Sequence, residues 1–434
     1  MKVLHLNTHD ITGGATRAVN RLREGLERLD GVDSRMLVRL RTGQDPKVAE
    51  LGWRDPLLRR VGRCWRRRRI EADLARYAQR DVFDAFSDDR AATGPDVTAA
   101  VRDCDLVHLH WVSNMVDVGH LLRHLPAGMP VVWTMHDMNP FTGGCHYTGG
   151  CGRFATGCGG CPQLGSKQAR DLSATIWRRK RDAIAGRAPE RTHFVAASQW
   201  TAGEAGRSGI LDGYPVTMIP YGLDTHVFAP REAGFSRRLL GLPDSARIIL
   251  FAADLLSNRR KGLAELVEGL ASLPGRPNSW LLVSLGAGAP DLSASGVEHL
   301  HLGKIDDDRL LSAAYSAADV FVMPSLQEAF GQTTLEAMAC AVPVVGFDNG
   351  GTPDLVRPGQ TGLLAPTGDG RAMAAAIAEL LGDEARRRSL GQQARQVAVS
   401  EYDLLIQAGR YRELYAALLG REKTSDSLHD RRAA

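Results

Sequence analysis

Two glutamates, Glu328 and Glu336, bracket a Phe-Gly pair in the segment PSLQEAFGQTTLE at residues 324–336. Carboxylates at this spacing can hydrogen-bond two sets of hydroxyl groups, and the glycine between them lets a ligand approach the backbone closely. Free N–H groups at the start of a following helix suit a phosphate. This combination fits a nucleotide-sugar, which carries hydroxyls at both ends of a diphosphate. Spacing alone leaves an ordinary strand–helix corner with two solvated glutamates as an equal alternative.

The elements around the two glutamates place them at one edge of a sheet. The apolar run Ala318–Met323 predicts a strand that ends just before Glu328. Leu335–Cys340 predicts a helix that carries Glu336 one to two turns from its start. Ligands of open α/β sheets bind in the crevice beyond the carboxyl ends of the strands, so both side chains are expected to face a binding cleft.

Apolar runs alternate with amphipathic helical stretches along most of the chain, which predicts an α/β fold of doubly wound parallel sheets. In the first half, strands are expected at 3–6, 35–38, 106–110, 131–135, 194–197 and 216–219. In the second half, they are expected at 248–252, 280–284, 299–302, 320–323 and 342–347. A chain of 434 residues is long enough for two such domains.

A Gly- and Pro-containing junction at 221–231 follows the first complete α/β run, so we place the domain boundary there. The expected segments are a first domain at 1–220 with an insertion at about 41–100 and a Cys-rich loop at 145–161, a second domain at 221–400, a helix at 401–420 that packs back across the cleft, and a disordered tail at 421–434.

Composition narrows the classes of protein that need to be considered. Hydrophobic residues make up 44% of the chain and charged residues 24%, which is ordinary for a globular protein. No apolar run reaches the length of a membrane span, and the N-terminus enters a strand without a secretory signal. Seven cysteines, an odd number, favour a reducing compartment. We therefore expect a cytoplasmic protein.

Three further clusters of residues could contribute to a site. Gly14 lies in a Gly-Gly turn between the first strand and the first helix, where backbone N–H groups could meet a phosphate or sugar. His136 follows a strand and could hydrogen-bond a sugar hydroxyl. Arg260 and Lys261 open a helix, where cations are disfavoured unless an anion binds nearby. A plain tight turn at Gly14 and a loop-capping role for His136 are the simpler alternatives.

Four cysteines lie within seventeen residues of a Gly-rich segment, and they are Cys145, Cys151, Cys158 and Cys161. The last two have zinc-knuckle spacing, so the set predicts a structural zinc site, with free thiols in a loop as the alternative. A catalytic metal is not expected here, because four thiolates leave no open coordination position.

Seven arginines and a tryptophan lie in Arg59–Arg69 (RRVGRCWRRRR). The simple interpretation is a solvated arm. The alternative is peripheral contact with anionic lipid at the inner face of the cell membrane, which Trp65 favours. Nucleic acid is not expected as a partner, because no platform of interleaved aromatic and basic residues accompanies the run.

Several of these stretches resemble the bacterial family 4 glycosyltransferases. The most specific are 328–336 (EAFGQTTLE), 350–354 (GGTPD) and 362–364 (GLL), with 221–228 and 260–262 also similar. Residues 136–162, which begin HDMNPFTGGCHY, resemble a subgroup linked to exopolysaccharide assembly of the colanic-acid type. The resemblance covers nearly the whole chain and is weakest at 41–100. It implies a GT-B architecture, in which two Rossmann-like domains face each other across a cleft.

The resemblance also implies roles for residues around a donor sugar. Glu328 would hydrogen-bond the sugar hydroxyls, and Glu336 would bind the ribose hydroxyls. Phe330 and Gly331 would offer backbone amides to the sugar. His136 matches the family's cleft histidine near that sugar.

On the diphosphate side, the resemblance assigns backbone amides to Gln332 and Thr333 and a cation to Lys261. Gly14 would line the opposite side of the diphosphate. Many family members carry an arginine six residues before the lysine, and Leu255 stands there in this chain. The arginines adjacent to the lysine are the expected replacements.

The family implies transfer of a sugar with retention of anomeric configuration, from a nucleotide-sugar to a glycan or lipid-linked acceptor, without a catalytic metal. Positioning and charge stabilisation would then replace a protein nucleophile. Two alternatives stay open: a GT-B nucleotide-sugar epimerase, and a non-catalytic scaffold in a polysaccharide assembly complex.

Overall fold

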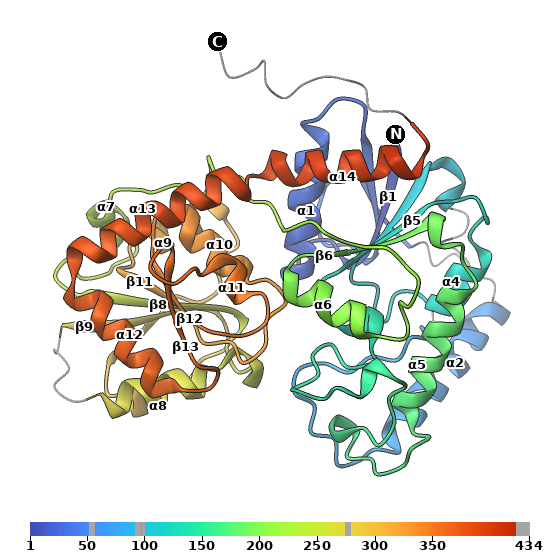
Figure 1. The fold of residues 1–434 in the computed structure, drawn as a ribbon, viewed down its shortest axis with the longest axis horizontal. Helices are drawn as coiled ribbons and strands as arrows, with labels where there is room; N and C mark the ends of the chain where they lie inside the picture. Colours follow the sequence, from blue (N-terminus) through green and yellow to red (C-terminus); the bar gives the residue numbers. More distant parts are fainter. Residues whose placement is uncertain (52–56, 92–96, 98–99, 274–278, 422–434) are drawn as a thin grey trace.

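The computed structural model describes residues 1–434 except 52–56, 92–96, 98–99, 274–278 and 422–434. The described chain forms two α/β domains, each built on one parallel sheet (Figure 1). The GT-B expectation of two facing parallel-sheet domains is therefore confirmed at the level of the fold. The tail beyond 421, for which disorder was expected, lies outside the described residues.

The first domain carries a seven-stranded sheet in the order β3-β2-β1-β4-β5-β6-β7. Its strands are β1 (Lys2–His9), β2 (Asp33–Leu40), β3 (Val48–Glu50), β4 (Leu106–Leu109), β5 (Val131–Met135), β6 (Thr192–Ala196) and β7 (Val216–Met218). Its helices are α1 (Gly14–Glu27), α2 (Leu57–Ala75), α4 (Val118–His124), α5 (Leu172–Ala185) and α6 (Gln199–Arg207).

The second domain carries a six-stranded sheet in the order β10-β9-β8-β11-β12-β13. Its strands are β8 (Arg247–Leu255), β9 (Trp280–Ala287), β10 (Glu298–His301), β11 (Val320–Met323), β12 (Val344–Phe347) and β13 (Gly362–Ala365). Its helices are α7 (Ala233–Leu239), α8 (Leu263–Ser272), α9 (Asp308–Ser316), α10 (Gln332–Ala339), α11 (Thr352–Leu355), α12 (Gly370–Gly382) and α13 (Glu384–Glu401).

Each sheet reverses its strand order at one place, between β1 and β4 in the first domain and between β8 and β11 in the second. The connections leaving these neighbouring strands turn to opposite sides, which opens a crevice at the carboxyl ends. Gly14 opens α1 directly after the loop that follows β1, Lys261 lies in the short turn after β8, and the loop after β11 carries Glu328. The topology therefore brings the predicted site residues to the two facing edges.

The final helix returns from the second domain to the first. α14 (Leu404–Leu418) begins at Asp403, whose carboxylate caps the helix by accepting from the N–H of Leu405. It packs against α1, with Tyr411 and Tyr415 fully buried (Figure 1). Contact is close because Gly25 has no side chain, and an added Cβ would lie 2.9 Å from the Cβ of Ala408.

One part of the region 41–100, which was expected to be an insertion outside the core, belongs to the first sheet. Val48–Glu50 pairs with β2 and extends the first sheet at its edge. Val48 and Leu51 are buried there. A strand of three residues is too short to produce a detectable alternation of apolar and polar side chains, and for this reason it was not predicted.

Candidate functional site

A cavity of about 520 Å³ lies between the two domains. All the residues predicted to bind or act on a ligand line it, and they are Gly14, His136, Arg260, Lys261, Glu328, Phe330, Gly331, Gln332, Thr333 and Glu336. These residues come from segments as far apart as α1 and α10, so the fold gathers a set that the sequence spreads over more than three hundred positions. The predicted cysteine set lines a different and much smaller cavity.

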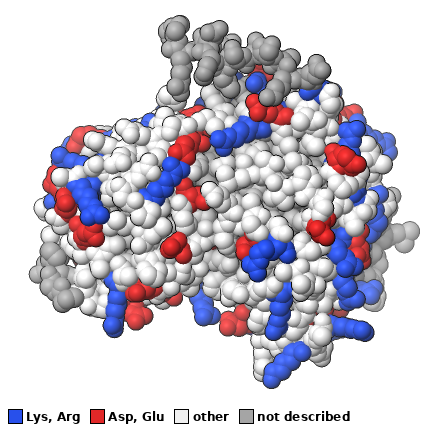
Figure 2. Space-filling view, viewed as in Figure 1, with Lys and Arg blue, Asp and Glu red and all other residues white. Residues whose placement is uncertain are grey.

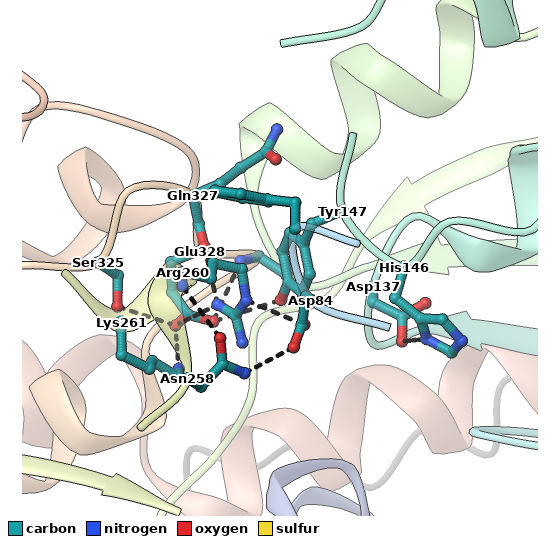
Figure 3. Close-up of polar contacts among 12 residues, drawn as sticks. Asp84, Asp137, His146, Tyr147, Asn258, Arg260, Lys261, Ser325, Gln327 and Glu328 are labelled. Carbon is teal, nitrogen blue, oxygen red and sulfur yellow. Dashed lines mark hydrogen bonds and ion pairs between the residues drawn. The ribbon is translucent and has the colours of Figure 1, made fainter. Parts of the chain in front are cut away.

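Glu328 is held by two cations in the wall of the cavity (Figure 3). Lys261 donates to its Oε2 at 2.6 Å, and Arg260 donates to the same oxygen at 3.1 Å. Burial alone would raise the pKa of Glu328, but the charges of Lys261 and Arg260 outweigh it and lower the pKa to about 2. The carboxylate is therefore ionised at neutral pH, and it can accept hydrogen bonds but cannot supply a proton.

Arg260 is largely occupied by contacts within the protein. Its Nε donates to Asp84 at 3.0 Å, its Nη1 donates to the carbonyl of Gln327 at 2.8 Å, and its guanidinium lies 3.9 Å from the ring centroid of Tyr147 (Figure 3). Asp84 and Tyr147 belong to the first domain, so Arg260 bridges the two domains. The expectation that Arg260 replaces the family arginine on the diphosphate does not fit these contacts, because the side chain has little freedom to turn toward a phosphate.

The neighbouring Arg259 does not fill that role either. Its side chain is 71% exposed, lies 3.6 Å from Asp81, and is not among the residues that line the cavity. Leu255 does line the cavity and is half exposed. Arg17 of α1 also lines it and keeps 30% of its side chain exposed, which makes it a cation that sequence reasoning missed.

Glu336 is buried in α10, and its carboxylate accepts hydrogen bonds from both domains. Arg21 of α1 donates to its Oε1 at 2.7 Å, and Arg17 donates to the same oxygen at 3.3 Å. Tyr315 of α9 donates to Oε2 at 2.7 Å. Although burial opposes ionisation, the two arginines lower the pKa of Glu336 below its usual range. Oε2 keeps capacity for a further donor such as a ribose hydroxyl.

The turn before α10 brings backbone close to the cavity. Gly331 has φ +95, which an L side chain rarely adopts, and it precedes the first turn of the helix. The next residue, Gln332, donates from Nε2 to the carbonyl of Gly14 at 2.7 Å and so links α10 to the opposite domain. Phe330 is buried and packs edge-to-face on Tyr221, with ring centroids 4.9 Å apart.

His136 follows β5 at the cavity wall, and both of its ring nitrogens have partners. Nε2 lies 3.0 Å from Nδ1 of His110, and Nδ1 lies 2.6 Å from the hydroxyl of Tyr221. Burial lowers the pKa of His136 to about 4, so the ring is neutral at physiological pH. The nearby acidic group, Asp137, instead bonds His146 at 2.6 Å (Figure 3).

The cysteine-rich segment surrounds a cavity of about 20 Å³ lined by Cys145, Cys151, Cys158 and Cys161. Burial raises the pKa of Cys145 and of Cys158 to about 12, so these thiols are protonated in this geometry. No three of the four sulfurs lie within 4.8 Å of one another; among the described residues only His5, His108 and His110 form such a group. The zinc site stays a prediction.

Of the residues that sequence reasoning missed, Tyr315 lies in α9 of the second domain, like its partner Glu336. The others are aromatic or charged side chains with a partner in the other domain: Arg17, Arg21, Asp84, Tyr147 and Tyr221. Their partners lie far away in sequence, so no local pattern marked them. Tyr221 did fall in a stretch that resembled the family, but its hydroxyl had no assigned role.

The surface and the helices add two observations. Acidic and basic side chains are intermixed over the face seen in Figure 2. Within the described part of the chain, no helix combines the length and apolar character needed to cross a membrane.

Comparison with known proteins shows which protein family the chain belongs to. A model of the family described as glycosyl transferases group 1 matches residues 246–383, which include the second sheet and α10. The chain is 33% identical over 341 residues to the alpha-maltose-1-phosphate synthase of Mycolicibacterium smegmatis, an alignment that covers 71% of this chain and 78% of that protein.

Solved structures agree with the fold. Sucrose-phosphate synthase from Thermosynechococcus elongatus superposes with a TM-score of 0.67 and 24% identity, over 96% of this chain and 100% of that one. Anabaena Alr3699/HepE, solved in complex with UDP and glucose, gives a TM-score of 0.67 at 18% identity with the same coverage. The two facing parallel-sheet domains are thus those of the GT-B glycosyltransferases. The chain itself belongs to the group 1 glycosyltransferase family.

Proposed function

We propose that the protein is a retaining glycosyltransferase that moves a hexose from a nucleotide-sugar to a hydroxyl of a glycan or lipid-linked acceptor. The observation that carries this proposal is the pairing of Glu328 with Lys261 and of Glu336 with Arg21 around one interdomain cavity. Hydroxyl-binding carboxylates and diphosphate-binding cations are what such a donor requires. The structural relative solved with UDP and glucose supports the same class of donor.

The chemistry follows from charges that are in place before the substrate binds. The acceptor hydroxyl attacks the anomeric carbon on the face from which the nucleoside diphosphate leaves, and a phosphate oxygen of the leaving group takes the proton. Ionised Glu328 orients the donor sugar through its hydroxyls. Lys261 shifts from its contact with Glu328 to the diphosphate and offsets the negative charge that develops there. No metal is required for this scheme.

Arg17 supplies the cation that Leu255 cannot. It reaches the cavity from α1, and Gly14 at the start of the same helix, which is assigned to the diphosphate, also lines the cavity. Its contact with Glu336 is longer than that of Arg21, and its side chain is more exposed, so it is the freer of the two to meet a phosphate.

A structural zinc ion held by Cys145, Cys151, Cys158 and Cys161 is part of the proposal. All four line one small cavity, and a set of four thiolates suits tetrahedral zinc. Buried Lys180 donates to the carbonyls of Asn139 and Thr142 close to this segment, and its positive charge would offset part of the charge of four thiolates. Metal binding would have to displace the thiol protons and draw the sulfurs together.

A role in cell-surface polysaccharide assembly, with α2 resting on an anionic membrane, completes the proposal. On this helix, Val61 is 50% exposed and Trp65 is 69% exposed, and Arg63 and the arginines of 66–69 lie on the same helix. An exposed apolar pair flanked by cations suits the interface of an anionic bilayer. The similarity of residues 136–162 to the exopolysaccharide subgroup supports the same setting. Cosedimentation with anionic vesicles, weakened in Trp65→Ala, is the expected result.

Product analysis tests the proposed reaction. The purified protein is incubated with a nucleotide-sugar and acceptor, and the products are identified by NMR. A new glycoside with the anomeric configuration of the donor supports retention. An isomerised donor without a glycoside would indicate an epimerase, and donor binding without turnover on any acceptor would indicate a scaffold.

A further inference from the structure

Three histidines from neighbouring strands form a hydrogen-bonded line that ends at a tyrosine in the cavity wall. Nδ1 of His5 lies 2.9 Å from Nε2 of His110, and Nδ1 of His110 lies 3.0 Å from Nε2 of His136. Nδ1 of His136 lies 2.6 Å from the hydroxyl of Tyr221. His136 and Tyr221 line the cavity, whereas His5 and His110 are buried behind it.

This line leaves His136 no free ring nitrogen. Its imidazole could bond a ligand only by giving up His110 or Tyr221. The hydroxyl of Tyr221, in contrast, has one donor position and two acceptor positions, and His136 engages only one of them. Burial raises the pKa of Tyr221 well above its usual range, so the phenol keeps its proton. Tyr221 is therefore the member of the line that can meet a ligand without disrupting the protein.

The position of the proton on each histidine ring determines which way the hydrogen bonds of the line run, and His5 at the buried end determines that position. Burial lowers the pKa of His5, of His110 and of His136, so each ring is neutral and has one N–H donor and one acceptor nitrogen. The nitrogen that carries the proton on one ring therefore determines which nitrogen carries it on the other two. Nε2 of His5 is buried and has no hydrogen-bond partner.

If the three rings carried the proton on Nε2, the line would end in a buried, unpaired N–H at His5. With the proton on Nδ1, it ends in an unpaired lone pair. Among buried backbone groups, an unpaired N–H is rarer than an unpaired acceptor, and the same preference applied to the imidazole favours the Nδ1–H form. In that form His136 donates to the oxygen of Tyr221, and the O–H of Tyr221 must point away from the ring, toward the cavity.

We infer that Tyr221 donates a hydrogen bond to an oxygen of the bound carbohydrate, and that His136, His110 and His5 are positioning residues that act through it. The inference rests on the proposed function for the nature of the ligand. It assigns the contact expected of His136 to its neighbour, and it gives two buried histidines a role in orienting that neighbour.

A metal bound to the inner histidines is the competing interpretation, because His5, His108 and His110 offer ligand atoms within 4.8 Å of one another. His108, however, uses Nδ1 for the hydroxyl of Tyr415 and Nε2 for Thr134, both at 2.7 Å. With both nitrogens of His110 also paired, a metal would have to break several short hydrogen bonds. Hydrogen bonding accounts for the cluster without one.

The first test needs no substrate. Protein labelled with ¹⁵N-histidine is examined by long-range ¹H–¹⁵N correlation, with resonances assigned from His5→Gln, His110→Gln and His136→Gln. The expected result is the Nδ1–H tautomer for all three rings near neutral pH. The Nε2–H tautomer would overturn the inference, and so would one equivalent of bound zinc that His5→Gln removes.

The second test asks whether His136 acts through Tyr221. Tyr221→Phe keeps the ring that packs on Phe330 and removes only the hydroxyl, so kcat/KM for transfer should fall about tenfold, the effect of losing one ligand hydrogen bond. His136→Gln should lower kcat/KM as well, and the double variant should be no worse than the larger single effect. Tyr415→Phe removes a hydroxyl from His108 away from the cavity and should keep normal kcat/KM.

Wild-type activity in Tyr221→Phe would overturn the inference, and so would multiplying effects in the double variant, because His136 would then contact the sugar by itself. Thermal unfolding of each variant separates these results from misfolding. A wild-type protein that transfers no sugar would count against the proposed function. A wild-type protein that transfers sugar, matched by Tyr221→Phe, would count against this inference alone.

Discussion

Arg21 in the first domain donates a hydrogen bond of 2.7 Å to Glu336 in the second, although 315 residues separate them. The side chains are 7% and 1% exposed, so the ion pair is desolvated. It ties α1 to α10 directly across the cavity. In the proposed function, a ribose bound to Glu336 would share a carboxylate that already joins the two domains, and ligand binding would then be coupled to domain closure.

Replacing Arg21 with alanine should destabilise the protein far more than replacing Arg17. Loss of Arg21 leaves the buried carboxylate with the hydroxyl of Tyr315 and with Arg17, at 3.3 Å, as its cation, and breaking such a buried pair costs about 3–5 kcal/mol. Arg17 is 30% exposed and lies 3.3 Å away, so Arg17→Ala should cost less than about 1 kcal/mol. Urea unfolding measures both values. If both variants lost the same free energy of unfolding, the contact of Arg21 with Glu336 would not be the one that holds the two domains together.

The ion pair of Glu328 should make the free energy of unfolding decrease as the pH falls. Its pKa is lowered from 4.5 to about 2 in the folded protein, chiefly by Lys261 against the opposing effect of burial. The stabilisation is therefore complete above about pH 4.5 and is lost as the pH falls toward 2.

Glu328→Gln should accordingly be less stable than wild type at pH 7, and its free energy of unfolding should fall less steeply between pH 4.5 and pH 3. Glu71→Gln, which removes an exposed pair with Arg67, is the matched control and should follow the wild-type curve. Parallel curves for Glu328→Gln and wild type would show that the pair does not form in solution.

Arg260 should behave as a bridge between domains. Asp84→Asn and Arg260→Lys should each lower stability, and the double variant should lose less than the sum, with a coupling of about 0.5–3 kcal/mol. The reason is that both changes break the same 3.0 Å contact. Additive losses, with nucleotide binding impaired only in Arg260→Lys, would restore the sequence-based assignment of Arg260 to the diphosphate.

Purified protein should contain one zinc ion per chain by elemental analysis. Cys158→Ser should lower this content, whereas Cys340→Ser, which changes a buried cysteine outside the segment, should not. Chelation should also loosen the loop that places Tyr147 on Arg260, and so reduce the melting temperature. A metal-free protein with unchanged melting temperature would leave the cysteines as free thiols.

The sequence was most informative where function requires a local pattern. Glu328, Gly331 and Glu336 lie within nine residues, from the end of an apolar strand into the following helix, and that arrangement favoured a cleft at a sheet edge as strongly as an ordinary strand–helix corner. The strand–helix alternation predicted both parallel sheets. Two edge strands of the described sheets were not predicted: Val48–Glu50 in the first sheet and Gly362–Ala365 in the second. With three and four residues, both are too short to carry a clear pattern.

The partners of these residues could not be predicted in the same way. The contact of Tyr147 with Arg260 and the line from His5 to Tyr221 depend on how two domains and three strands come together. The basic turn illustrates the difficulty. Its composition predicted an anionic ligand, which stays a prediction, whereas the anions that Arg260 contacts in the structure are carboxylates of the protein itself, Asp84 and Glu328.

The most direct measurement is a donor screen with matched variants. Wild type and Glu328→Gln are titrated with a panel of nucleotide-sugars, and release of nucleoside diphosphate is followed. At least one nucleotide-sugar should bind wild type and be turned over, and Glu328→Gln should lose about 100- to 1,000-fold of that turnover. If no nucleotide-sugar binds wild type, or if Glu328→Gln turns it over at the wild-type rate, the assignment of the interdomain cavity as the donor site is wrong.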